Sequence, residues 1–564
     1  MVSVTLSLTT KAQTVENLTK IHSKSSTYLS PYKVVSLADH VYTFMHFDNK
    51  DTLFIDGESQ TEFLSPGAGE SNHIEFVISK FDLNHKLVNL GSISGTRILC
   101  KNIQVHQDKI YVFVNFSVNP SLKYNGAEIW KATQNPNDWE DSWNVMVVLD
   151  EDLNLLDVKG IDHYNSGFDG IAFGDGRMYL SGYFTNISDT KETVEVDGYK
   201  LSSLTSERNL GTSFMLTYDT QLGKIIHSEL FNVYYYGYYT GTQSLLVGLD
   251  GCAYQLIMSS GGVFTYQDLD FELAGLWSAN VLIKYTLNGK VDKIVNLCKN
   301  NVTFISEMHM TTTGDLLLYG ECWNGLGYNG VDLVKTHLPY AAVLFSLDGK
   351  DLSLKWYDYM ASEQKIWVGG IATDKEDNIY IMNSNGIGLL AEDKEGKTLI
   401  SGNHIYKYNM DGKRLSDFRS QYGKPFFLST KGVDTLIIMK GVGSIQGSFD
   451  SLLNITNNYG NTKEFALFQL ILNKTSGFIE IEKNEKDRIY PNPVHKDGLL
   501  TISGDHSSVD KAFVISDRMG RTVASGKLDD TAQICLSSYN LNSGIYFIRI
   551  GKDDSIPMKM LILE

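Results

Sequence analysis

One pattern recurs along most of this chain: an alternating apolar run, an aromatic residue and a polar turn that often ends in Gly-Lys. Alternation that leads up to an Asn-Gly or Asp-Gly turn is the strongest short-range sequence signal for a β-hairpin. A second, shorter strand pattern precedes each copy. The clearest copies are SFMLTYDTQLGK at Ser213–Lys224, VLIKYTLNGK at Val281–Lys290, AVLFSLDGK at Ala342–Lys350 and HIYKYNMDGK at His404–Lys413.

The spacing of these copies sets the fold class. They recur about every 60 to 70 residues, and this length is sufficient for a unit of four antiparallel strands. One such sheet cannot bury both faces alone, but several packed around an axis can. We therefore predict an all-β chain, with a β-propeller of about seven blades over residues 34–482 and a small C-terminal β-sandwich. Tandem sandwiches are the alternative, but they would not share one hairpin motif at one period.

The third unit carries a family resemblance. It contains GRMYLSGYF at Gly176–Phe184, followed by GTSFMLTYDTQLGKII at Gly211–Ile226. These segments resemble the bacterial β-propeller repeat family, in which Y-x-x-G-x-F precedes an aromatic-Asp-x-x-Gly hairpin. The resemblance implies a fold and leaves the activity open, because propellers host many chemistries.

The end of the chain is patterned differently. The charged stretch KNEKDR, at 483–488, precedes short strand patterns separated by Gly, Asn and Asp turns. We interpret 483–488 as a linker and 489–564 as a separate domain.

This terminal domain resembles the C-terminal sorting domain of type IX secretion cargo in Bacteroidetes. Four segments match in order: the Tyr-Pro-Asn-Pro motif, two later turns and a terminal strand. The residues expected to carry the sorting signal are Tyr490, Pro491, Asn492, Pro493, Gly520, Gly544, Ile545, Tyr546 and Lys559. The resemblance implies export to the cell surface or the medium. It also implies an outer-membrane shuttle and the translocon as partners, and a sortase that removes the domain.

The N-terminus is compatible with export. In residues 1–12, VTLSL followed by Thr10-Lys11-Ala12 is typical of the tail of a signal peptide with a small-residue cleavage site, and a frayed segment is an equal alternative. We expect residues 13–33 to supply a strand that closes the ring with the last blade. Nothing in the sequence approaches the roughly 18 uninterrupted apolar residues of a membrane span.

Charge and cysteine content exclude several classes of partner and site. The formal net charge of −17 argues against nucleic acid or anionic membrane as the main partner, because phosphate binding needs clustered Lys and Arg. The five cysteines are scattered, with no C-x-x-C pair, so neither a zinc site nor a disulfide framework is expected.

Aromatic residues are the candidate ligand contacts. VYYYGYYTGTQ, at Val233–Gln243, holds five tyrosines around one glycine. They could form a stacking platform for a sugar or peptide, but side chains alternate along a strand, so we favour packing between blades. Two tryptophans lie in long connections within blades, where binding loops are common. The candidate ligand-binding residues are Tyr235, Tyr236, Tyr238, Trp277 and Trp323.

No catalytic motif is present: G-x-S-x-G, H-E-x-x-H and the P-loop are all missing from the sequence. His106, His309 and His404 lie in strand patterns and are expected to be structural. The acidic segment Asp374–Asn378 could bind calcium, but a hairpin turn is favoured. We expect no metal and no cofactor, and predict a non-catalytic module that binds a glycan or protein. The alternative is a secreted propeller hydrolase or lyase acting on glycan or peptide, which would need carboxylates or a His–carboxylate pair converging at a channel mouth.

Overall fold

The computed structural model divides the chain into two units, Met1–Asn473 and Lys474–Glu564. The described residues are 13–23, 29–37, 39–48, 53–56, 58–59, 73–96, 98–117, 121–131, 142–161, 166–184, 193–196, 199–204, 210–234, 241–259, 262–267, 269–273, 279–297, 302–323, 326–329, 331–334, 338–385, 391–394, 398–399, 402–420, 425–430, 435–443, 449–450, 455–456, 464–472, 488–490, 494–496, 498–503, 512–517, 521–528, 533–539, 541–550 and 558–563.

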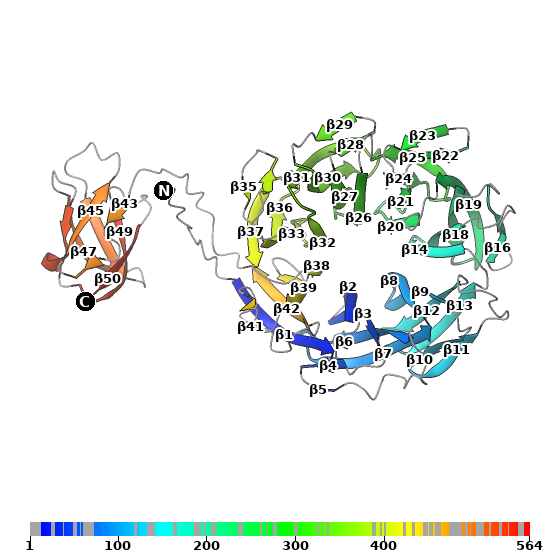
Figure 1. Ribbon diagram of the computed structural model, residues 1–564, viewed down its shortest axis with the longest axis horizontal. Coiled ribbons are helices and arrows are strands. Elements are labelled where there is room, and N and C mark those ends of the chain that lie inside the picture. The colour runs from blue at the N-terminus through cyan, green and yellow to red at the C-terminus, as the bar shows by residue number, and fades with distance from the viewer. Residues whose placement is uncertain are drawn as a thin grey trace. The chain divides into compact units, whose positions relative to one another are not determined.

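The first unit is built from four-stranded antiparallel sheets that follow one another in chain order. Seven of them lie within the described residues, and we number them by their first strands. Figure 1 shows these first strands around the centre of a ring. Sheet 1 holds β2 (Leu29–Leu37), β3 (His40–Asp48), β6 (His73–Phe81) and β7 (Leu87–Thr96); sheet 2 holds β8 (Leu99–His106), β9 (Lys109–Ser117), β12 (Ser142–Asp150) and β13 (Leu155–Ile161); sheet 3 holds β14 (Ser166–Gly174), β15 (Arg177–Phe184), β18 (Leu210–Asp219) and β19 (Lys224–Tyr234).

The same order continues around the ring, and it makes the unit a β-propeller, as predicted. Sheet 4 holds β20 (Gly241–Val247), β21 (Ala253–Ser259), β24 (Ala279–Tyr285) and β25 (Val291–Asn296); sheet 5 holds β26 (Val302–Met310), β27 (Asp315–Trp323), β30 (Tyr340–Asp348) and β31 (Leu354–Ser362); sheet 6 holds β32 (Trp367–Thr373), β33 (Ile379–Asn385), β36 (Gly402–Tyr408) and β37 (Arg414–Ser420); sheet 7 holds β38 (Pro425–Thr430), β39 (Thr435–Gly443), β42 (Glu464–Leu472) and β1 (Gln13–Ser23).

The ring closes through its N-terminal strand. β1 pairs antiparallel with β42, with Ile21 opposite Phe465 and His22 opposite Glu464. The outermost of the four strands in sheet 7 therefore comes from the opposite end of the unit. Of the segment 13–33, only Gln13–Ser23 form this strand, whereas residues 29–33 belong to β2 of sheet 1, so the first blade begins before the expected boundary at residue 34. This pairing joins the first and last parts of the unit by backbone hydrogen bonds and so closes the ring.

Small hairpins occupy the connection between the second and third strands of each sheet. They are β4 (Leu53–Ile55) with β5 (Glu58–Ser59), β10 (Ser121–Tyr124) with β11 (Ala127–Lys131), β16 (Thr193–Val196) with β17 (Tyr199–Ser202), β22 (Gly262–Tyr266) with β23 (Leu269–Leu273), β28 (Leu326–Tyr328) with β29 (Val331–Val334), β34 (Ala391–Asp393) with β35 (Thr398–Leu399), and β40 (Phe449–Asp450) with β41 (Ile455–Thr456). Four of these hairpins extend the sheet of the preceding repeat, through the pairs β4–β1, β10–β7, β22–β19 and β34–β31. Neighbouring repeats are thereby joined by backbone hydrogen bonds as well as by packing.

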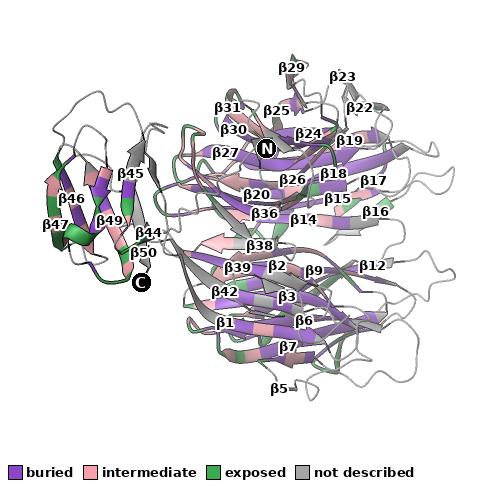
Figure 2. Ribbon diagram, turned by 60° about the vertical axis from the view of Figure 1, so that its left-hand side comes forward, coloured by how far each residue is buried: buried purple, intermediate pink, exposed green. Residues whose placement is uncertain are grey.

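Apolar layers between neighbouring sheets form the core, and Figure 2 shows the buried residues that run along the strands. Tyrosines of the second strands tie one sheet to the next. Tyr42 Oη donates to Glu151 O of sheet 2 (2.7 Å), and Tyr254 Oη donates to Gly349 O of sheet 5 (2.6 Å). Both tyrosine rings are buried. A buried phenol needs a hydrogen-bond partner, and here the turn of the next sheet supplies it.

The predicted hairpin turns occupy equivalent positions. Asn288-Gly289 joins β24 to β25, Asp348-Gly349 joins β30 to β31, and Asp411-Gly412 joins β36 to β37. Each turn links the third strand of its sheet to the fourth, and the three sheets are successive, as the repeat predicts. Gly289 and Gly412 have φ angles of 81° and 77°, a region that disfavours residues with a Cβ atom.

The second unit has its own core between two sheets. The three-stranded sheet holds β43 (Arg488–Tyr490), β45 (Leu499–Ser503) and β48 (Gln533–Cys535), followed by the 3-10 turn η2 (Leu536–Tyr539). The five-stranded sheet runs in the order β44 (Val494–His495), β50 (Met558–Leu563), β49 (Gly544–Ile550), β46 (Ala512–Asp517) and β47 (Thr522–Lys527). Leu500 and Ile534 from the first sheet share one apolar cluster with Phe513, Ile515 and Ile548 from the second.

Candidate binding channel and sorting domain

The first strands of the propeller sheets enclose a cavity of about 680 Å³. Residues of β2, β8, β20, β26, β32 and β38 line it. Its wall carries Ser, Thr, Asn and Gln side chains next to the backbone of these strands. Such a wall offers both donors and acceptors for hydrogen bonds, which suits a polar ligand.

Three charged residues that the structure describes line this channel: Lys33, Lys101 of β8 and Glu307. Lys33, on β2, donates from Nζ to Ile103 O at 2.8 Å. Burial lowers the pKa of Lys33, and the negative charge of Glu307 on β26 acts against that shift. Burial likewise raises the pKa of Glu307, and Lys33 opposes the rise. Among the described residues that line the channel, Glu307 is the one carboxylic acid.

A second carboxylate, Asp169 of β14, joins sheet 3 to sheet 4 by accepting a hydrogen bond from β20. Its Oδ2 accepts from Thr242 N at 2.8 Å, and Ser181 Oγ donates to its Oδ1 at 3.4 Å. Burial raises the pKa of Asp169 to about 6, against the hydrogen bond from Thr242 and the positive charge of Lys101. Asp169 thus fixes the start of β20 against β14.

The three histidines of interest lie in strands, as expected. His309 Nε2 lies 2.7 Å from Thr373 Oγ1 of the neighbouring sheet, and burial lowers the pKa of His309 to about 4, so the ring is neutral at pH 7. His106 stacks on Phe173, with ring centroids 4.8 Å apart. His404 contacts a carboxylate, with 2.7 Å between its Nδ1 and Asp417 Oδ1. That pair joins the third and fourth strands of sheet 6, whereas first strands line the channel.

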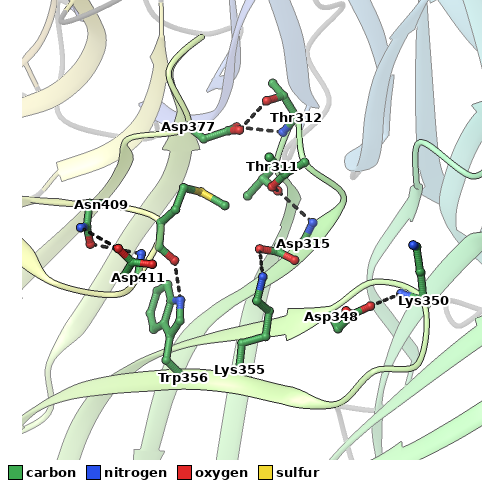
Figure 3. A network of polar contacts seen from close by, with 12 residues as sticks. Thr311, Thr312, Asp315, Asp348, Lys350, Lys355, Trp356, Asp377, Asn409 and Asp411 are labelled. Carbon is green, nitrogen blue, oxygen red and sulfur yellow. Dashed lines mark hydrogen bonds and ion pairs between the residues drawn. The ribbon is translucent and has the colours of Figure 1, made fainter.

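The acidic segment Asp374–Asn378 forms the turn between β32 and β33. Asp374 Oδ1 accepts from the backbone N–H groups of Glu376 and Asn378, at 2.9 and 3.0 Å, and Tyr380 Oη donates to its Oδ2. Figure 3 shows the neighbouring Asp377, whose Oδ1 accepts from Thr312 N at 2.8 Å. Both carboxylates are therefore engaged within the protein. Over the described ranges, His, Cys, Asp and Glu nowhere gather in a group of three or more that could hold a metal ion.

Of the aromatic candidates, only Trp323 can be placed. Tyr235, Tyr236, Tyr238 and Trp277 lie outside the described residues. Trp323 is the last residue of β27, and its ring centroid lies 5.8 Å from that of Phe304 and 5.6 Å from that of Tyr340. It does not contribute to the described channel lining. Lys33 and Glu307 were not predicted as site residues, because the hairpin repeat marks the outer strands of each sheet and the first strands carry little of it.

In the second unit, the described part of the sorting signal lies in strands and turns. Tyr490 ends β43 opposite Thr501, and Lys559 pairs with Phe547 in the terminal strand β50. Gly544, Ile545 and Tyr546 are the first three residues of β49. Ile545 is 43% exposed, and Tyr546 Oη donates a hydrogen bond to Asn542 O. Pro491, Asn492, Pro493 and Gly520 lie outside the described residues.

By its fold, the protein belongs to the class in which a β-propeller is joined to a separate all-β domain. The terminal domain can also be identified, because residues 488–564 match the family model described as "Secretion system C-terminal sorting domain". These residues form a type IX secretion C-terminal sorting domain, and the protein is exported to the cell surface or secreted. It therefore interacts with the type IX secretion machinery. Within the described residues, no helix has the length and apolar character needed to cross a membrane.

Solved structures with similar folds include other propellers. PorZ, a surface component of the type IX secretion system of Porphyromonas gingivalis, is 9% identical over 96% of this chain and 99% of its own, with a TM-score of 0.19. The Dos1 propeller is 6% identical over 78% and 95%, with a TM-score of 0.34. The polysaccharide lyase Uly1 is 9% identical over 79% and 90%, with a TM-score of 0.33. Similarities this remote do not bear on activity. No curated protein matches the sequence.

Proposed function

We propose that the exported propeller is a non-catalytic binding module that holds a polar ligand, part of a glycan or a protein, in its channel. The observation that carries the proposal is the composition of the channel wall. Ser, Thr, Asn and Gln side chains alternate there with apolar ones, and Lys33, Lys101 and Glu307 add charged donors and one charged acceptor. A concave site with a few charged groups among neutral ones is suited to orient a ligand.

The same wall gives little support to hydrolysis. Glycosidases need two carboxyl groups about 5 to 10 Å apart, one as acid and one as base or nucleophile. Among the described lining residues, Glu307 has no second carboxylate beside it. His309 is neutral and is held by Thr373, and the His404–Asp417 pair belongs to outer strands. Binding is therefore favoured over the hydrolase or lyase alternative.

The test uses the full-length protein on an array of surface glycans and peptides, followed by titration of the best hits. Glu307→Gln keeps the size of the side chain and removes its charge, and Lys33→Met does the same for the cation. Each variant should weaken binding at least about 10-fold, because a hydrogen bond to a charged group contributes about 1.5 to 3 kcal/mol. Glu376→Gln, in an exposed turn, is the matched control and should leave affinity unchanged.

Product release should be measured on the same hits. New reducing ends or new peptide termini that disappear in the Glu307→Gln variant would contradict the binding proposal and favour the hydrolase. Affinity that is unchanged by both channel variants would place the ligand elsewhere.

We further propose that an outer-membrane shuttle recognises the terminal domain, and that a sortase removes it within or near the linker 483–488. The separate apolar core of the second unit supports this, because a domain with its own core can be recognised and removed as a unit. Mass spectrometry of the protein recovered from the cell surface tests it: a mature C-terminus upstream of Tyr490 is expected, and an intact Glu564 terminus would refute removal.

A further inference from the structure

A half-exposed tryptophan marks a surface between sheets 5 and 6. Trp367 is the first residue of β32 and is 49% exposed. Among the large apolar side chains that the structure describes as exposed, it is the one aromatic. An indole offers a wide, flat contact area, and ordering it on a ligand costs little conformational entropy.

One face of this indole is held in place from within the protein. Lys365 Nζ lies 4.6 Å from the Trp367 ring centroid, 5.9 Å from that of Trp323 and 6.0 Å from that of Phe304. The same ammonium pairs with Glu321 Oε1 at 3.1 Å. Cation–π contacts and an ion pair thus fix Lys365, and Lys365 in turn orients Trp367. The indole is therefore preorganised, with a large part of its surface open to solvent.

Two polar atoms beside it are unused. Trp323 Nε1 and Glu321 Oε2 are buried and lack a hydrogen-bond partner within the described part of the protein. The two residues are two positions apart on β27, so their side chains lie on the same face of sheet 5, and Phe304 pairs with Glu321 on the adjacent strand. Burial raises the pKa of Glu321, and Lys365 opposes the rise. Unsatisfied buried polar atoms are costly and are rare without a reason.

We propose that Trp367, Trp323, Phe304, Lys365 and Glu321 form a sugar-binding subsite that stacks a neutral pyranose ring of a glycan on Trp367. A pyranose presents an apolar C–H face to the indole. Its hydroxyl groups both donate and accept, so they can use the Lys365 ammonium as donor and the Glu321 carboxylate as acceptor.

Other ligand classes fit less well. A cationic group would be repelled by Lys365, whose ammonium lies over one face of Trp367. A purely apolar partner would remove water from Lys365 and Glu321 without replacing their hydrogen bonds. The inference rests on the proposed function, because it assumes a binding module. It adds a second site outside the channel and names the ligand class.

The experiment titrates the full-length protein with cellohexaose, mannohexaose, maltohexaose and chitohexaose, followed by tryptophan fluorescence and isothermal calorimetry. Saturable binding of at least one sugar is expected. Trp367→Ala should raise its Kd at least 10-fold, Trp367→Phe should raise it less because a flat ring remains, and Lys365→Met should raise it several-fold. Leu269→Ala removes a 59% exposed side chain of β23 and is the control for loss of exposed apolar surface. Thermal unfolding verifies that each variant is folded.

The outcomes separate this subsite from the channel. Sugar binding that survives Trp367→Ala and is lost in Glu307→Gln would overturn the subsite and leave the channel proposal standing. Failure of all four sugars to bind would also overturn the subsite, whereas the channel would still be testable with its array hits. Binding that depends on Trp367 but not on Glu307 would establish the subsite alone.

Discussion

Replacement of Asp169 by Asn tests the electrostatics that join β14 to β20. Burial raises the pKa of Asp169 from 3.8 to about 6, so the unfolded chain loses this proton near pH 4 and the folded protein keeps it until near pH 6. Between these values the folded state binds more protons, and stability therefore falls as pH rises. A difference of about two pKa units corresponds to about 3 kcal/mol at most. Above about pH 6, Asp169 is ionised in both states, so the free energy that its burial costs the folded protein no longer changes with pH.

In the Asp169→Asn variant this penalty is absent, while the amide oxygen can still accept from Thr242 N. The free energy of unfolding of the propeller, measured by denaturant titration from pH 4 to pH 8, should therefore fall less steeply with pH than in the wild type. At pH 7 the variant should be more stable by up to about 3 kcal/mol. Asp292→Asn, at an exposed position, is the control for removal of one negative charge. Parallel pH profiles for wild type and Asp169→Asn would refute the buried-carboxylate explanation.

Three further predictions concern the architecture. Deletion of residues 558–564 removes β50, which pairs with both β44 and β49, so the terminal domain should unfold. Calorimetry should then show an unchanged transition for the propeller, and cell fractionation should find the protein in the periplasm instead of at the surface. Tyr254→Phe should cost only about 1 kcal/mol in denaturant titrations, because Lys284 Nζ still donates to Gly349 O at 2.9 Å; a loss above about 3 kcal/mol would contradict this. Deletion of residues 13–23 should lower the melting temperature of the whole propeller, since buried Ile21 and the β1–β42 pairing are lost; an unchanged melting curve would show that the ring does not need β1.

The outer half of each sheet could be predicted from sequence because local chemistry determines it. The turns at Gly289, Gly349 and Gly412 follow alternating strands that are contiguous in the chain, so turn residues and period together identify third and fourth strands. Several of the extra hairpins between second and third strands carry the same turn signal: Asn-Gly or Asp-Gly lies between their strands at 56–57, 125–126, 197–198 and 329–330. What the local sequence does not reveal is the sheet with which each hairpin pairs. β10 and β22 gain their stability from pairing with the preceding sheet, which no short window of sequence reveals.

The channel could not be predicted for a related reason. Lys33 and Glu307 come from sheets 1 and 5 and line one channel only because the ring closes. Similarly, Trp323 could be singled out as an aromatic in a connection, but Lys365 and Trp367 belong to the next repeat. Their contact depends on how sheets 5 and 6 pack, so it is a property of the assembled ring.

Closure by β1 also links export to folding. β1 begins at Gln13, immediately after the Ala12–Gln13 bond, which would be the cleavage position if residues 1–12 are the tail of a signal peptide, the equal alternative being a frayed segment. A cut there would leave the closing strand whole, whereas a cut beyond Ile21 would remove the residues that pair with Phe465 and Glu464. The last sheet cannot be completed until β42 meets β1, so the ring closes only when both ends of the first unit are available. The sorting domain has an apolar core of its own.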